Sequence, residues 1–193
     1  MGADQASARI DTPCRLEVGR QPGHHERVSV PLNLPQELFL AQARSDYEIF
    51  SGLAHQGVCH RLHYLQMCTE KLSKVWFWRG MNPPAHGHST FEPFLRALHT
   101  SGRADFHRMF GYRDDRRFAL QWPSILDLAL RIQQLVPGPA NPNPEYPWPR
   151  DRPTSSPLTH PFPEWHDWNL TTAGRRLKLF VENLLRDYLA YFP

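Results

Sequence analysis

The segment from Cys59 to His88 constrains the fold more than any other part of the chain. Apolar residues recur there at helical spacing, and they form a stripe that is wider than a surface helix needs. The stripe consists of Leu62, Tyr64, Leu65, Cys68, Leu72, Val75 and Trp76. This pattern predicts a long helix that is buried on more than one side and that cannot continue through Pro83-Pro84. We therefore expect the other helices to pack around it.

Helices are also predicted on both sides of this segment. The first begins near Pro35, because proline suits the first turn of a helix, and it runs to about Ala54. After the double proline, Ser89 and Glu92 have the spacing of a capping box, so a third helix is expected to begin there.

Two more helices follow a polar, arginine-rich connector. The first of them is predicted to open at Trp122-Pro123-Ser124 and to run to Val136. The last is predicted to begin at Thr171 or Thr172 and to run to about Tyr191. Its first turns carry three cationic side chains that oppose the helix dipole, so we expect partners for them or an earlier helix start: Arg175, Arg176 and Lys178.

Proline dominates the segment from Pro137 to Pro163, which contains ten of the nineteen prolines of the chain. Such a segment cannot form a regular helix or an inner strand. It also contains Tyr146, Trp148 and Phe162, so we expect an ordered extended loop that wraps the bundle rather than a plain linker.

Composition and length bound the domain organisation. The 193 residues, 40% of them hydrophobic, suffice for one core, so we expect an N-terminal arm over 1–34 and a single helical domain over 35–193, with a proline-rich insertion over 137–170. In the arm, Val28 and Val30 form a small strand or lie across the bundle. The net charge of +3 permits a nucleic-acid surface without indicating one. Three cysteines without a CxxC motif, and the lack of a long apolar run, predict a cytoplasmic protein with no membrane contact.

The central segment carries polar residues in a specific order, namely His63-Tyr64, Gln66, Thr69-Glu70-Lys71, Lys74, Arg79-Gly80, Pro83-Pro84 and His86 or His88. This order resembles the central segment of HEPN domains, in which a Gln, an Ala/Thr-Glu-Lys step and a second Lys lead to Arg-Gly, a proline turn and a His. Arg44-Ser45-Asp46 is similar to the Arg/x/Asp step of that family. The resemblance implies an all-α, up-and-down bundle of four or five helices that pairs with itself or with another protein through one face.

Catalytic HEPN domains are metal-independent ribonucleases with an Arg followed, four to six residues later, by a His on the last long helix. The His accepts the proton of the RNA 2′-hydroxyl, and the Arg holds the phosphate. The last predicted helix here contains arginines but no His. A displaced site would consist of Arg79, His86 and His88. The alternative is a structural role, with Arg79 at its helix end and His88 or Ser89 capping the next helix.

A metal site is the other chemical possibility in the central helix. Cys59 and His63 are four residues apart on one helical face, with His60 and Cys68 nearby. Only two ligands meet there, whereas structural zinc needs four, so we predict no metal. The common phosphate-binding and hydrolase motifs are missing, and we predict no cofactor.

Three functions remain compatible with these patterns. The leading hypothesis is a non-catalytic HEPN-like module that binds or regulates as a homodimer or with a protein partner, such as a nucleotidyltransferase or a component of a toxin-antitoxin or other defence system. The second is a HEPN-like ribonuclease or toxin with the displaced site. The third is a non-catalytic RNA-binding module built on Arg175, Arg176 and Lys178, which must then share one face with Arg113, Arg116 and Arg117.

Overall fold

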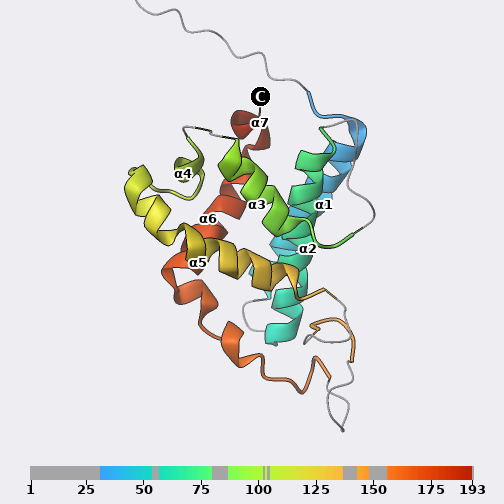
Figure 1. Cartoon of the computed structure of the whole chain (residues 1–193). Coiled ribbons are helices and arrows are strands. Elements are labelled where there is room, and N and C mark those ends of the chain that lie inside the picture. Colours follow the sequence, from blue (N-terminus) through green and yellow to red (C-terminus); the bar gives the residue numbers. More distant parts are fainter. Residues whose placement is uncertain are drawn as a thin grey trace, which may run out of the picture.

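The computed structural model describes residues 31–53, 57–79, 87–101, 103, 105–136, 143–147 and 156–192. These residues form helices, turns and loops, and no strand occurs among them (Figure 1). The longer helices are α1 (Leu34–Gly52), α2 (Val58–Phe77), α3 (Phe91–Thr100), α5 (Asp115–Gln133) and α6 (Thr172–Arg186). The shorter ones are α4 (Phe106–Met109), α7 (Tyr188–Tyr191) and the 3₁₀ helices η1 (Pro163–Trp165) and η2 (Trp168–Leu170). The expected all-α fold class is confirmed.

Several predicted features fall outside the described residues. They include Val28 and Val30 of the N-terminal arm, Gly80, and the double proline Pro83-Pro84. None of the helices in the described part of the chain is both long and apolar enough to cross a membrane.

Helix α2 contacts more of the bundle than a surface helix does. It packs against α1, α3, α5 and α6, and α1 runs beside it (Figure 1). Every residue from Cys68 to Ser73 is buried. Because consecutive helical residues point in different directions, this part of α2 is covered on all sides, as the wide apolar stripe predicted.

Helix α1 begins at Leu34 because the preceding residue caps it. The Asn33 side chain accepts a hydrogen bond from the Gln36 backbone N–H, and the Gln36 side chain accepts one from the Asn33 N–H, each at 3.0 Å. Gln36 also donates its side-chain amide to the Val75 carbonyl at 2.9 Å. The start of α1 is thereby tied to the end of α2, and the predicted start near Pro35 is confirmed within one residue.

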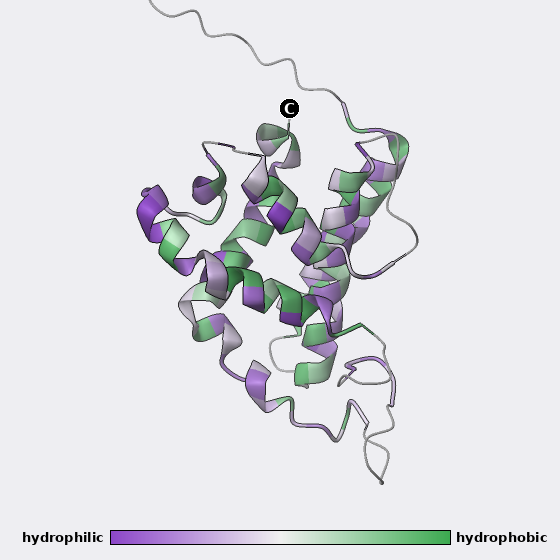
Figure 2. Cartoon of the chain, in the orientation of Figure 1, coloured by the Kyte–Doolittle hydropathy of each residue, from purple (hydrophilic) through white to green (hydrophobic). Residues whose placement is uncertain are grey.

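Aromatic side chains fill the layer where α3, α4, α5 and α6 meet. Phe110 stacks on Phe180, with 4.3 Å between the ring centroids, and Phe118 lies 5.4 Å from Phe106. Such pairs contribute about 0.5–1.5 kcal/mol beyond the burial of their surface. Figure 2 shows apolar and polar residues alternating along α3 and α5, as amphipathic helices require.

Helix α5 starts earlier than its sequence predicted. The predicted opening at Trp122-Pro123-Ser124 is wrong, because the helix begins at Asp115 and Pro123 lies inside it. Asp114 caps this start, and its side chain accepts from the Arg116 N–H at 2.9 Å. Pro123 costs the helix one backbone hydrogen bond, but Phe118 and Trp122 pack against the α4 side of the core and hold the first turns in place.

Helix α3 has a different start from the one predicted. Its N-cap is Thr90, which makes no side-chain capping bond, so the expected capping box of Ser89 and Glu92 does not form. Glu92 pairs instead with Arg96, one turn further along the helix.

The last helix begins at Thr172, as predicted, but does not run unbroken to Tyr191. It ends at Arg186, and Asp187 caps the short helix α7 by accepting from the Ala190 N–H at 3.2 Å. A residue whose side chain competes for backbone N–H groups favours such a break over helix continuation.

The described parts of the proline-rich segment lie against the helices. Asn143 is buried, and its side chain accepts from the backbone N–H groups of Glu145 and Tyr146 at 2.8 and 3.3 Å. The Glu145 carboxylate is 3.8 Å from the imidazole of His63 on α2. Phe162 is buried in the core with a left-handed φ of 47°. Residues 143–147 and 156–162 form turns and loops rather than helix or strand, as the proline content predicted, and the short 3₁₀ helices η1 and η2 follow them.

Candidate functional site

A buried ion pair joins α1 to α2. Lys71 Nζ lies 2.5 Å from Asp46 Oδ2, and the two side chains are only 6% and 10% exposed. An ammonium group and a carboxylate that are both shielded from water need each other as partners, because a single unpaired charge in the interior is strongly unfavourable. Burial and the neighbouring Asp46 carboxylate raise the pKa of the Cys68 thiol. This thiol therefore packs in the core in its neutral form and is not an activated nucleophile.

Glu70 carries the next part of the same polar layer. Its carboxylate lies 2.5 Å from Lys74 Nζ and 2.8 Å from His88 Nδ1, and it accepts from the Gln66 side-chain amide at 2.9 Å. Burial raises the pKa of this carboxyl, but the hydrogen bonds from Lys74, His88 and Gln66 outweigh burial and lower it below its usual value. Glu70 thus stays ionised, and its contact with His88 ties the residue before α3 to α2.

The structure places two of the three predicted catalytic residues. Arg79 follows α2, and its guanidinium lies 5.8 Å from the ring centroid of Trp76. His88 precedes α3 and contacts Glu70, while His86 lies outside the described residues. His88 and Ser89 do not cap α3, since its N-cap is Thr90. A catalytic role for Arg79, His86 and His88 stays a prediction.

Of the predicted cationic residues of α6, Arg176 reaches the turn between α4 and α5. Its guanidinium donates to the Gly111 carbonyl at 2.9 Å and lies 4.5 Å from the ring centroid of Tyr112. Gly111 has a φ of +73°, and an added Cβ would lie 2.4 Å from a Leu179 methyl carbon and 2.8 Å from Arg176 Nη1. The absence of a side chain at Gly111 therefore lets this turn sit directly on α6.

The other two cations of α6 point elsewhere. Arg175 folds back and donates to the Leu170 carbonyl, and Lys178 lies 3.7 Å from Glu182. Successive residues of a helix are 100° apart, so the three side chains cannot share one face. Each has a partner that offsets its unfavourable position near the helix N-terminus, as the sequence led us to expect.

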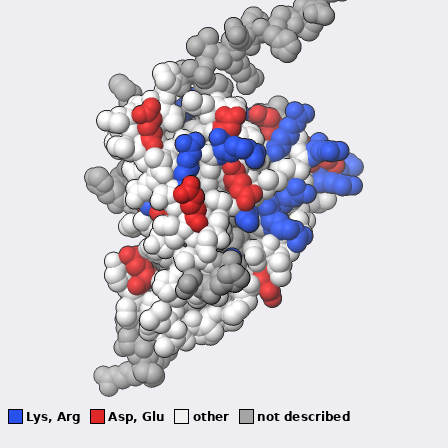
Figure 3. All heavy atoms as spheres, turned by 180° about the vertical axis from the view of Figure 1, so that it is seen from behind, with Lys and Arg blue, Asp and Glu red and all other residues white. Residues whose placement is uncertain are grey.

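Arginines gather where Arg176 meets the chain segment around Gly111. Four of them, Arg108, Arg113, Arg116 and Arg117, are exposed and lie within ten residues of one another in the chain, and Arg176 reaches this segment at Gly111. We call this arginine-rich region, with its five arginines, the basic face. The sequence analysis did not identify Arg108 as part of this cluster. Its position three residues before Gly111 is the feature of the sequence that could have indicated it. Figure 3 shows Lys and Arg side chains crowded on the right, the side on which α4 and the start of α5 lie in this reversed view.

Few carboxylates offset the charge of the basic face. Asp114 and Asp115 lie in the same segment, and Asp114 uses its side chain to cap α5. Its distance of 3.9 Å to Arg117 Nε marks a weak, exposed pair that contributes about 0–1 kcal/mol. The exposed guanidinium groups of Arg108, Arg113 and Arg116 therefore keep most of their capacity to bind an external anion, whereas Arg176 already donates to the Gly111 carbonyl.

The aromatic rings beneath the basic face are buried. Phe106, Phe110 and Phe118 are at most 4% exposed, and Tyr112 is 8% exposed. Nucleic-acid bases stack on exposed rings, so the described part of this face offers charge without a stacking platform. It is therefore suited to phosphate groups rather than to bases.

The two residues of α2 that were considered as metal ligands, Cys59 and His63, contact different neighbours. Cys59 Sγ lies 3.6 Å from His60 Nδ1, whereas His63 faces Glu145. The described residues contain no group of three or more His, Cys, Asp or Glu side chains placed to hold a metal ion.

Comparisons with known proteins return no match. No protein-family model fits the chain, and neither the curated proteins nor the solved structures contain a significant match to it. The function is therefore inferred from the contacts described above.

Proposed function

We propose that this protein is a HEPN-like, non-catalytic module that binds RNA by its phosphate backbone through the basic face. The observation that supports this proposal is the contact of Arg176 with Gly111, which brings an arginine of α6 onto the arginine-rich turn before α5. The RNA-binding hypothesis required Arg175, Arg176 and Lys178 to share one face with Arg113, Arg116 and Arg117. Of the three, Arg176 contacts that segment, whereas Arg175 and Lys178 contact other groups, so the proposed site is built on Arg176 alone from α6.

The chemistry of the basic face favours a polyanion over a small anion. A guanidinium binds phosphate through two parallel N–H donors, and several of them along a surface match a repeating phosphate chain. The buried rings beneath the face provide no base readout, so the binding is expected to be independent of RNA sequence. Its affinity is expected to fall steeply with salt, because each neutralised phosphate releases counterions.

The buried polar layer supports the HEPN-like assignment. The residues that carry the resemblance contact one another, with Asp46 of α1 paired to Lys71 and Gln66 bonded to Glu70 on α2. In this proposal the module works as a homodimer or with a protein partner, such as a nucleotidyltransferase or a toxin-antitoxin component.

The test is fluorescence anisotropy with labelled single-stranded and structured RNAs in chelator, over a range of salt. We expect Arg113→Ala/Arg117→Ala to reduce the slope of log affinity against log salt by roughly 1.4–1.8, the loss for two phosphate contacts. The matched control is Arg96→Ala/Lys178→Ala, which removes the same charge from α3 and α6 and should leave the slope nearly unchanged.

Equal loss in the two double variants would refute a specific basic face, since net charge alone would then explain binding. Cleavage of the RNA in chelator would favour the ribonuclease hypothesis instead. Such cleavage should then disappear in Arg79→Ala/His86→Ala/His88→Ala.

A further inference from the structure

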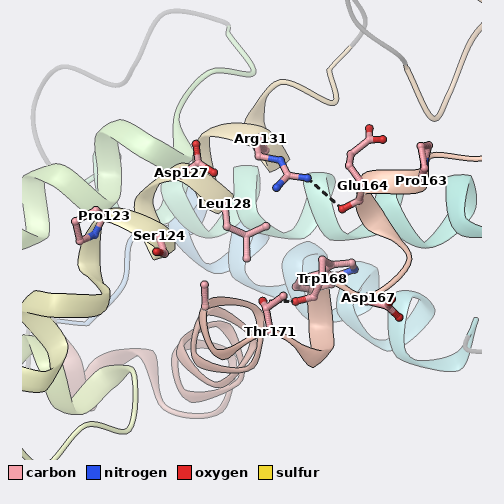
Figure 4. A pocket seen from close by; sticks show the side chains of 11 residues that line it. Pro123, Ser124, Asp127, Leu128, Arg131, Pro163, Glu164, Asp167, Trp168 and Thr171 are labelled. Atoms are coloured by element: carbon pink, nitrogen blue, oxygen red, sulfur yellow. Dashed lines mark hydrogen bonds between the residues drawn. The ribbon is translucent and has the colours of Figure 1, made fainter.

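A pocket of about 580 Å³ opens between α5 and the segment that contains η1 and η2 (Figure 4). This volume lies within the range of small-molecule sites in proteins. In Figure 4 the side chains of Leu128, Trp168 and Thr171 lie together in the middle of the pocket, with Arg131 and Glu164 above them. The α5 residues that line the pocket run from Pro123 to Arg131, whereas those of the basic face are Arg116 and Arg117 at the start of the helix. The pocket and the basic face therefore share no residue.

The floor of the pocket is apolar and held firmly in place. Leu128 and Trp168 are 5% and 7% exposed, so each presents a small edge of a well-packed side chain. The Trp168 carbonyl accepts from the Thr171 hydroxyl at 2.6 Å. A Cβ on Gly174 would lie 1.9 Å from that carbonyl oxygen, which shows how closely η2 sits on α6. The floor is therefore formed before any ligand arrives.

The charge around the pocket is negative. Asp127, Glu164 and Asp167 line it, and no side-chain hydrogen bond or ion pair engages their carboxylates within the described part of the chain. The one cation in the lining, Arg131, donates to the Glu164 carbonyl at 3.1 Å and lies 5.0 Å from the ring centroid of Trp165. Because the whole chain has a net charge of +3, this negative surface is a local feature.

We propose that this pocket binds a linear aliphatic polyamine. Its methylene groups would cover the apolar surface of Leu128 and Trp168, as the stems of lysine side chains cover apolar surface in proteins. Its ammonium groups would donate hydrogen bonds to the carboxylates of Asp127, Glu164 and Asp167 at the edges. A polyamine fits this lining better than a metal ion, since a metal ion would leave the apolar floor uncovered.

The experiment is a calorimetric titration of the full chain with spermidine at low ionic strength and without RNA. We expect saturable binding at one site, with amide shifts in NMR spectra confined to residues 123–131 and 163–173. Asp127→Asn/Asp167→Asn should weaken binding by about two- to fivefold for each carboxylate removed. Glu37→Gln/Glu48→Gln, which removes two exposed carboxylates of α1, should leave the affinity unchanged.

A second titration tests the apolar floor. Hexaamminecobalt(III) has the same charge as spermidine but no methylene chain, so it should bind more weakly. Equal binding of the two cations, equal loss in both double variants, or binding of an oligolysine peptide without binding of spermidine would each overturn the proposal. The RNA-binding test substitutes residues of the basic face, whereas the polyamine test substitutes residues of the pocket. Either proposal can therefore fail without the other.

Discussion

Removal of Lys71 provides a quantitative test of the buried layer between α1 and α2. In Lys71→Met the aliphatic stem is retained, while the ammonium group 2.5 Å from Asp46 is lost. The Asp46 carboxylate, 10% exposed, is then left without its partner. Breaking a buried pair in this way costs about 3–5 kcal/mol, which is a large part of the 5–15 kcal/mol that typically stabilises a domain.

The assay is urea unfolding followed by circular dichroism, with thermal unfolding as a second measurement. For a chain of this size, the expected loss corresponds to a fall in Tm of roughly 6–20 °C. The matched control is Lys178→Met, because Lys178 belongs to an exposed pair with Glu182. That substitution should cost less than about 1 kcal/mol.

The double variant Asp46→Leu/Lys71→Met completes the cycle. An apolar pair of similar volume often replaces a buried ion pair without loss, so we expect stability within about 1 kcal/mol of the wild type. The coupling energy should then exceed about 2 kcal/mol. Additive losses, or a cost for Lys71→Met no larger than that for Lys178→Met, would refute the description of this pair as buried and mutually dependent.

Two further predictions concern Glu70 and Gly174. Because the pKa of Glu70 is lower in the folded protein than in the unfolded chain, its ionisation stabilises the fold above about pH 4.3, and this contribution is lost as the pH falls through the folded pKa. Glu70→Gln should therefore be less stable than the wild type at neutral pH and should lose less stability on acidification. Urea unfolding of both proteins at several pH values measures this, and parallel plots of unfolding free energy against pH would contradict it. Gly174→Ala places a Cβ against the Trp168 carbonyl and should cost at least about 1–3 kcal/mol, whereas Gly52→Ala, with nothing within 4 Å, should be neutral or slightly stabilising. Equal unfolding midpoints for the two glycine variants would contradict the close contact of η2 with α6.

The sequence predicted the helices that its local patterns define. The apolar stripe located α2, and the proline and threonine at the starts of α1 and α6 located those ends. The predicted start of α5 was wrong, because Pro123 is typical of the first turn of a helix. The true N-cap, Asp114, lies nine residues earlier, within a polar stretch. The early start of α5 is stabilised by the packing of Phe118 and Trp122 against α4. This contact is between distant segments, so the sequence of α5 alone does not predict it.

The site was predictable only in part, for the same reason. Arg176 was identified as a cation on the last helix, but its contact with Gly111, 65 residues earlier, depends on how α4 packs on α6. Likewise the pairing of Asp46 with Lys71 joins residues that the resemblance identified singly. The pocket beside Trp168 had no sequence signal, since its lining comes from two segments that are brought together by folding.

The burial of α2 on all sides from Cys68 to Ser73 also determines how the molecule opens. A helix that touches α1, α3, α5 and α6 cannot fray or detach unless its neighbours separate from it. The backbone amides from Cys68 to Ser73 can then exchange with deuterium only when the whole bundle unfolds, so their exchange free energy equals that of global unfolding.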